Sequence, residues 1–211
     1  MSALGDAASK LSSASSWAVT TAASSNAQAV SVTSSSSTPA GTYSVGVQQL
    51  ARAQSASSGA VAQGTAMGTG SITIELGSWS GSSFTASGST PSSITIDAGA
   101  DSLTDIAASI NAADAGVTAA VLRDASGERL LLQSKDTGTT NGFRITVADD
   151  DGNNTDAAGL SRLAFDPGTA SGMTLAQSAL DAQLTINGVS TTSTSNRLTD
   201  TLPGMTLQLS E

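Results

Sequence analysis

The sequence predicts an α+β chain that is mainly β, with two β-rich domains, one inserted in the other, and a short N-terminal helix. Three observations predict this architecture. A well-capped amphipathic helix is followed by a hairpin pattern within residues 101–133. Short runs of alternating apolar residues recur elsewhere, as in half-buried strands. Two glycine-containing stretches with few apolar anchors, 59–70 and 167–173, interrupt these runs and mark domain boundaries.

These boundaries divide the chain into three parts. Residues 1–19 contain the N-terminal helix, 20–62 together with 172–211 form a discontinuous outer domain, and 63–171 form the inserted domain. A chain of 211 residues is long enough for two small domains. Aromatic residues make up only 3% of the chain, so we expect thin cores built from Val, Ile, Leu and Ala.

Residues 101–133 are the core against which we expect the weaker strands to be arranged. Ser102 can cap a helix, and Asp105 three residues later completes a capping-box pattern. Gly116 can take the left-handed position after the helix. A strand at 117–122, a turn at 124–127 and a returning strand around 130–132 complete a hairpin. The apolar stripe of the helix consists of Leu103, Ile106, Ala107, Ile110 and Ala113.

The other predicted elements have weaker signals. Residues 2–16 form a helix whose apolar side is mainly alanine. Residues 49–58 leave the preceding strand with Leu50 as their only large apolar anchor, 77–93 form a polar loop or hairpin, and 198–202 form a short helical turn. Asn187-Gly188 is the strongest hairpin signal. Strands are predicted at residues 29–33, 41–48, 71–76, 94–97, 143–148, 183–187 and 205–209.

Composition and charge exclude several classes of function. The net charge is −9, and the two lysines and six arginines are scattered along the chain. Nucleic acid and anionic membrane surfaces are therefore not expected as partners. The chain contains neither cysteine nor histidine, which removes thiolate chemistry, disulfides and the commonest general base. It also lacks an apolar run long enough for a membrane span and the pattern of a cleaved signal peptide.

No catalytic, cofactor-binding or metal-binding residues are predicted, and we do not expect an enzyme. The acidic loop at 149–156 resembles a calcium loop only at its start. A calcium-binding EF-hand needs glycine at its sixth position and glutamate at its twelfth, where this chain has Asn154 and Leu160. A solvated turn is the better interpretation. Phosphate-binding glycine motifs and a GxSxG nucleophile motif are both missing from the sequence.

Two aromatic residues in the 77–93 segment allow two interpretations. Trp79 and Phe84 could form a stacking platform for a sugar. Alternatively, one of them anchors the loop to the sheet, which is the commoner role for an aromatic side chain in such a position.

Three stretches together resemble the bacterial flagellar filament cap protein family, called FliD or hook-associated cap proteins. Residues 41–54, GTYSVGVQQLARAQ, resemble its GTYxVxVxQLAxAQ segment. Residues 102–111, SLTDIAASIN, with 116–121 and 129–138, resemble its next segment. Residues 182–188, AQLTING, resemble the hook "IN" motif, assigned here to Ile186-Asn187.

The resemblance implies a structural protein that caps the filament and promotes flagellin polymerisation at its tip. It implies a ring-like oligomer of the full-length protein, flagellin as a partner, and extracellular location at the flagellum tip after export through the flagellar channel. It also implies that residues 1–19 end a helical leg of coiled-coil type and that the two β-rich domains are head domains. The last strand is barely finished at Glu211, so we expect a truncated head domain.

An alternative from a different class is a bacterial surface adhesin or carbohydrate-binding β-domain. Serine and threonine richness, acidity and the Trp79–Phe84 pair favour it. The two interpretations overlap, because some cap proteins also contact host surfaces or mucin. Filament growth in a strain that lacks the gene would distinguish them.

Overall fold

The computed structural model describes residues 20–35, 38–167 and 172–210. These residues group into two compact units: unit 1 comprises the chain up to Leu50 and from Ala182 onward, and unit 2 comprises Ala51–Asp181. The described residues are mainly strand and contain one α-helix, α3 (Leu103–Ala113), so the predicted fold class is confirmed. The predicted N-terminal helix at 2–16 lies outside the described residues.

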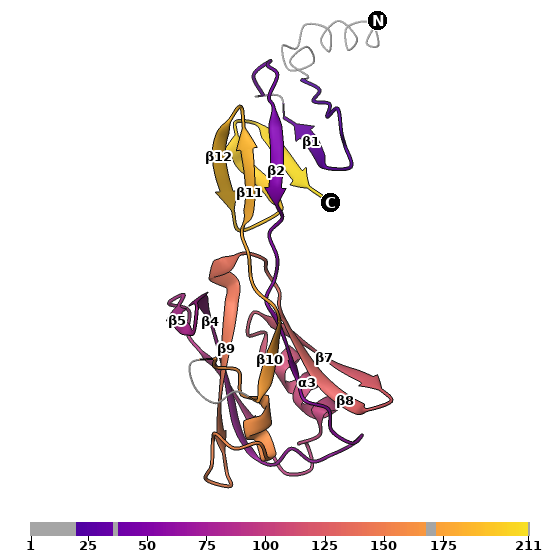
Figure 1. Ribbon diagram of the computed structural model, residues 1–211, viewed down its shortest axis with the longest axis vertical. Coiled ribbons are helices and arrows are strands. Elements are labelled where there is room, and N and C mark those ends of the chain that lie inside the picture. The colour runs from indigo at the N-terminus through magenta and orange to yellow at the C-terminus, as the bar shows by residue number, and fades with distance from the viewer. Residues whose placement is uncertain (1–19, 36–37, 168–171, 211) are drawn as a thin grey trace, which may run out of the picture. The chain divides into compact units, whose positions relative to one another are not determined.

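Unit 1 consists of two three-stranded antiparallel sheets (Figure 1). One has the order β1-β14-β13, with β1 (Val30–Ser34), β14 (Met205–Leu209) and β13 (Arg197–Leu202). The other has the order β12-β11-β2, with β12 (Val189–Ser193), β11 (Ala182–Ile186) and β2 (Val45–Gln49). Each sheet buries apolar side chains on one face. The buried apolar residues of these strands are Val30, Ala182, Leu184, Ile186, Leu198, Leu207 and Leu209.

Two tight turns of unit 1 each join a pair of neighbouring strands. Asn187 and Gly188 have φ values of 50° and 83° and join β11 to β12, which confirms the predicted two-residue hairpin. The predicted helical turn at 198–202 is wrong, because Arg197–Leu202 is strand β13. Its partner is β14, and Pro203-Gly204 forms the turn between them, with Gly204 at φ 72°. The proline–glycine pair thus ends a strand rather than a helix.

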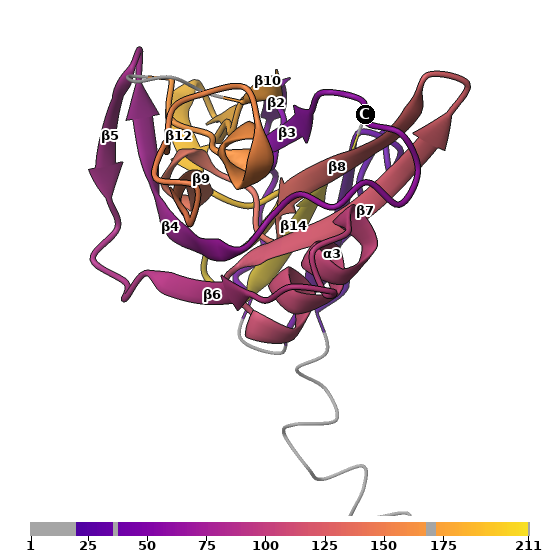
Figure 2. The ribbon, with the colours of Figure 1, turned by 90° about the horizontal axis from the view of Figure 1, so that it is seen from below.

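Unit 2 contains two antiparallel sheets and the helix (Figure 2). One sheet has the order β10-β3-β8-β7, formed by β10 (Met173–Gln177), β3 (Ser55–Ser58), β8 (Gly127–Ser134) and β7 (Val117–Asp124). In the other, the long strand β4 (Gly70–Ser80) pairs with β5 (Ser83–Ala86), β6 (Ser92–Ile96) and β9 (Gly142–Asp149). Unit 2 also contains two short 3₁₀ helices, η1 (Thr139–Asn141) and η2 (Gly159–Leu163).

The predicted helix and hairpin form the centre of unit 2. Ser102 is the N-cap, and its Oγ accepts a hydrogen bond from the Asp105 N–H at 3.3 Å. The helix buries Leu103, Ile106, Ala107 and Ile110 in one apolar cluster with residues of both sheets. Strands β7 and β8 pair along their full length, as the sequence predicted.

The end of α3 differs from the prediction. Asp114, not Gly116, takes the left-handed cap position, with φ 50°. Gly116 has φ 74°, a left-handed conformation that favours glycine, but leads into β7; a Cβ at this position would lie 2.6 Å from the Leu76 Cδ1 atom, so the Leu76 side chain would have to shift. Asp114 forms an ion pair with Lys135. The hydrogen bond and the charge of Lys135 lower the pKa of the Asp114 carboxyl.

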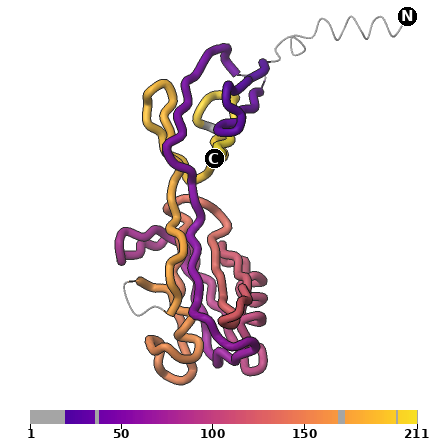
Figure 3. The backbone as a smooth tube through the Cα atoms, turned by 45° about the vertical axis from the view of Figure 1, so that its right-hand side comes forward, coloured from indigo at the N-terminus to yellow at the C-terminus, as the bar shows by residue number. Residues whose placement is uncertain are grey.

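The segment 49–70 also differs from the prediction. Residues 55–58 form strand β3, which pairs with β8 and β10, and within unit 2 residues 51–58 and 173–177 run side by side (Figure 3). Val61 forms a bridge with Glu128, and Met67 is buried. The glycines of this stretch therefore lie inside unit 2, with Gly64 in a turn and Gly70 at the start of β4, and the chain passes between units at Leu50–Ala51 and Asp181–Ala182.

Candidate functional site

The acidic loop at residues 149–156 folds as a series of local turns. Asp149 is buried, and its carboxylate accepts hydrogen bonds from the N–H groups of Ser161 at 3.2 Å and Asp151 at 3.4 Å. The Asp151 carboxylate accepts one from the Asn153 N–H at 2.8 Å. Across the described residues, no group of three or more acidic side chains is placed to hold a metal ion. The contacts of Asp151 and Asn153, each two residues on from its acceptor, are typical of Asx turns, whereas the Ser161 contact ties Asp149 to the 3₁₀ helix η2.

We predict that calcium does not raise the melting temperature beyond an ionic-strength control. The loop lacks the glycine and bidentate glutamate of a calcium cage, and its carboxylates already accept backbone hydrogen bonds. A ligand that binds only the folded state would raise the melting temperature saturably. Thermal unfolding with calcium or matched sodium salt checks this. A saturable shift that Asp151→Ala removes would contradict it.

Trp79 and Phe84 lie opposite each other on β4 and β5 and anchor this hairpin to the core. Their ring centroids are 4.9 Å apart, and Trp79 also contacts Phe165 edge-on at 5.9 Å. The Trp79 indole N–H donates to the Phe143 carbonyl at 2.9 Å, and the Arg144 guanidinium lies over the Phe84 ring at 4.9 Å. Both rings are thus engaged within the protein, which favours the anchoring interpretation over the sugar platform.

Gln54 forms an amide clamp on the outer edge of β9. Its Nε2 donates to the Phe143 carbonyl at 2.9 Å, and its Oε1 accepts from the Phe143 N–H at 3.2 Å. Gln54 is buried, and its own carbonyl accepts from the Ser134 N–H at 2.9 Å. One side chain therefore replaces a neighbouring strand at Phe143. No local sequence pattern predicts this role of Gln54, because Phe143 lies 89 positions further along the chain.

Asn111 forms a second amide clamp, on the outer edge of β7. Its Nδ2 donates to the Ala119 carbonyl and its Oδ1 accepts from the Ala119 N–H, both at 2.8 Å. The last turn of α3 is thereby tied to the strand that follows it. An asparagine two residues before the end of a predicted helix was the available signal, but nothing in the pattern identified its partner.

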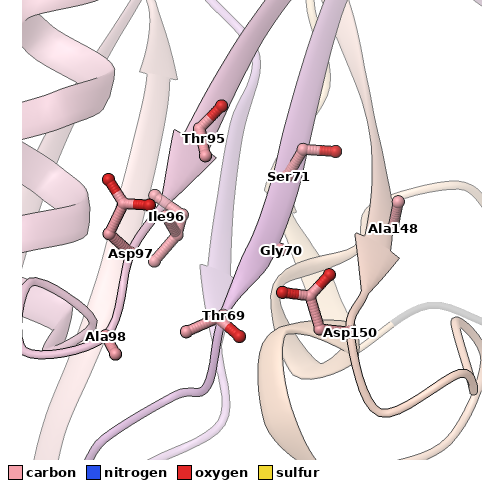
Figure 4. Close-up of a pocket in the computed structure, with 9 residues that line it drawn as sticks. All are labelled: Thr69, Gly70, Ser71, Thr95, Ile96, Asp97, Ala98, Ala148 and Asp150. Atoms are coloured by element: carbon pink, nitrogen blue, oxygen red, sulfur yellow. The ribbon is translucent and has the colours of Figure 1, made fainter.

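A shallow polar groove of about 460 Å³ lies where β4, β6 and β9 meet (Figure 4). Its only charged lining residues are Asp97 and Asp150, both exposed, and the others are glycine, alanine, serine, threonine and the buried Ile96. The aromatic pair Trp79 and Phe84 is not part of it. The groove lacks the aromatic face on which a sugar ring would stack.

Within residues 20–35, 38–167 and 172–210, the exposed large apolar side chains all lie on edge strands. They are Leu122 on β7 (56% exposed), Leu175 on β10 (48%) and Val189 on β12 (67%). Edge strands present unpaired backbone groups to other chains. Among the described residues, the surfaces best suited to protein contacts are therefore sheet edges, and no helix there is long and apolar enough to cross a membrane.

The antiparallel sheets and the amide clamps of Gln54 and Asn111 together define a β-rich structural module. Two family models match parts of this chain. The model of the flagellar hook-associated protein 2 N-terminus matches residues 1–54, and the model of the flagellin hook IN motif matches residues 83–136. The second match corrects our assignment of that motif. The matched range contains Ile110-Asn111 in α3, where Asn111 clamps Ala119, and excludes Ile186-Asn187.

Similar proteins and structures agree with these matches. The chain is 30% identical to the B-type flagellar hook-associated protein 2 of Pseudomonas aeruginosa over 99% of its length, and spans 44% of that protein. A crystal structure of the D1-D2-D3 domains of the Escherichia coli flagellar cap protein FliD has a TM-score of 0.80 at 32% identity, covering 97% of this chain and 55% of that one. The D2-D3 structure from Escherichia coli has a TM-score of 0.73 at 30% identity, covering 87% and 89%.

The chain therefore belongs to the flagellar filament cap protein family, whose members are called flagellar hook-associated protein 2 or FliD. This confirms the resemblance found in the sequence. The chain spans less than half the length of the Pseudomonas aeruginosa relative.

Proposed function

We propose that this chain is the head part of a bacterial flagellar filament cap that promotes flagellin polymerisation at the filament tip. The observation that supports this most directly is the match to the Escherichia coli D2-D3 structure, which covers 87% of this chain and 89% of that one. Units 1 and 2 then correspond to the two head domains. The full-length protein forms a ring-like homo-oligomer whose other partner is flagellin.

The proposed location is outside the cell, at the flagellum tip, after export through the flagellar channel. The proposal assigns the chain a role in assembly rather than catalysis. The family names of its relatives support such a role. They do not favour the adhesin alternative, and the engaged rings of Trp79 and Phe84 remove its main structural support.

We predict that the full-length protein restores filament growth and swimming in a cap-deficient strain, whereas these 211 residues alone do not. The resemblance implies that the helical leg makes the contact with the filament. The predicted leg helix at 2–16 has an apolar stripe that is mainly alanine, so it buries little area. Stable association usually needs about 1,000 Å² or more of matched surface. A swimming assay and light scattering check this, with the fragment expected to be mostly monomeric at micromolar concentration. A fragment that restores swimming would contradict this division of roles.

A further inference from the structure

The sequence contains two Asn–Gly pairs, Asn141-Gly142 and Asn187-Gly188. Glycine has no Cβ, so its backbone nitrogen is accessible to the side chain of the asparagine that precedes it. Attack of this nitrogen on the side-chain amide carbon converts asparagine to aspartate without an enzyme, and asparagine is accordingly a thermolabile residue. The two pairs have different surroundings, which decide which of them reacts.

The pair Asn187-Gly188 is exposed and forms the turn between β11 and β12 (Figure 1). The Ser44 N–H donates to Oδ1 of Asn187 at 2.8 Å, and the Ser44 carbonyl accepts from the Asn187 N–H at 2.8 Å. Because a backbone N–H can only donate, the atom that faces it is the amide oxygen. Within the described residues, no hydrogen bond uses Nδ2 of Asn187 or the N–H of Gly188.

We propose that Asn187 is a site of spontaneous deamidation and that the Ser44 N–H accelerates the reaction. The Gly188 nitrogen gives its proton to hydroxide and attacks Cγ of Asn187. The negative charge that develops on Oδ1 faces the Ser44 N–H, which acts as an oxyanion donor. The bond between Cγ and Nδ2 then breaks, Nδ2 takes a proton from water and leaves as ammonia, and a succinimide ring remains.

Water opens the succinimide at either of its carbonyls. Attack at Cγ gives aspartate, which keeps the acceptor for the Ser44 N–H and suits a two-residue turn before Gly188. The hairpin then persists with an added negative charge. Attack at the main-chain carbonyl gives isoaspartate, which lengthens the backbone of the turn and disturbs the regular β11–β12 ladder. This chemistry needs only unit 1 and water, so it does not depend on the proposed cap function.

The pair Asn141-Gly142 is an internal control, because its surroundings oppose the same steps. Nδ2 of Asn141, the group that would leave, donates to the Thr137 carbonyl at 2.7 Å. Gly142 is buried and pairs with Gly77 in the β4–β9 ladder, so movement of its nitrogen toward the side chain would break this pairing. Asn141 is therefore held against the reaction, although its local sequence signal is the same.

Peptide mapping by mass spectrometry measures both sites in one sample. After incubation at mildly alkaline pH, the folded chain should contain several-fold more deamidated Asn187 than deamidated Asn141. In urea the two sites should react at similar rates, because each asparagine precedes a glycine and the folded surroundings are lost. Equal extents in the folded chain, or more product at Asn141, would overturn the proposal.

Ser44→Pro tests the role of the Ser44 N–H. Proline removes this donor but keeps the carbonyl that accepts from the Asn187 N–H. Deamidation of Asn187 should fall several-fold, with that of Asn141 and the circular dichroism spectrum unchanged. Ser44→Ala keeps the N–H and should react at the rate of the unsubstituted chain. A folded Ser44→Pro variant that deamidates at least as fast as Ser44→Ala would overturn the role of Ser44.

The unsubstituted chain gives a second test of this role, which does not require the proline variant to fold. An oxyanion donor at Asn187 predicts that this residue reacts at least as fast in the folded chain as in urea. Slower deamidation of Asn187 in the folded chain would show that the contact with Ser44 restrains the side chain, and would also overturn the role of Ser44.

Discussion

Replacing Ile110 with alanine is expected to lower the free energy of unfolding by about 2–5 kcal/mol, the range for truncating a large buried aliphatic side chain. Ile110 is 0% exposed, and it packs in the cluster that joins α3 to both sheets of unit 2. The loss combines transfer free energy with the cavity left behind, because helix and sheets can close only part of the space. Urea unfolding measures this loss of free energy as a lower midpoint, provided that the dependence of the unfolding free energy on urea concentration is unchanged.

Leu122→Ala is the matched control for this truncation. Leu122 is 56% exposed on β7, so its truncation should change stability by about 0.5 kcal/mol or less. If both variants unfold at the wild-type midpoint, α3 does not form the core of unit 2. If both are equally destabilised, burial is not the cause.

Replacing Gln54 with leucine is expected to lower the free energy of unfolding by about 1–3 kcal/mol, the cost of leaving a buried polar group without a partner. The Phe143 N–H loses its acceptor, while the Phe143 carbonyl keeps the indole N–H of Trp79. Gln133→Leu, at an exposed position of β8, is the matched control and should be nearly neutral.

Removing both donors to the Phe143 carbonyl tests the clamp further. Trp79→Phe alone leaves the amide of Gln54 in place, whereas Trp79→Phe in the Gln54→Leu background leaves the carbonyl unpaired. The double variant should therefore lose more stability than the sum of the two single variants. Additive losses would show that the two groups do not share this carbonyl as an acceptor.

Local signals in the sequence predicted the best-formed parts of the fold. The cap at Ser102 and the spacing of Ile106 and Ile110 are encoded within one helix, and Asn187-Gly188 encodes its turn within two residues. Each depends on neighbours in the chain, so periodicity and turn chemistry were sufficient to find them.

Elements that depend on distant partners were missed. Residues 55–58 are serine and alanine, with no apolar alternation, and they form β3 only because β8 and β10 supply hydrogen bonds on both sides. The wrong helical turn at 198–202 has a local cause instead: β13 pairs with β14 directly across Pro203-Gly204, and a proline–glycine pair alone does not distinguish a turn after a helix from a turn between strands.

The amide clamp of Gln54 likewise depends on a partner that is distant in the sequence. Gln54 reaches Phe143 across 89 positions of the chain, and no local pattern predicts such a pair. The glycines of 59–70 were equally ambiguous, because a glycine in a turn within a domain leaves the same signal as one at a boundary. The transitions between the units lie instead beside Leu50 and Asp181, in stretches without a glycine signal.

Immunogold electron microscopy of the full-length protein in its own cells tests the central claim most directly. An epitope tag inserted after Gly88, in an exposed turn between β5 and β6, should not disturb either sheet, and unchanged swimming of the tagged strain is the control. A filament cap predicts gold at the free ends of the flagella and nowhere else along them. Gold spread along the filaments or over the cell body, in a strain that swims normally, would contradict it.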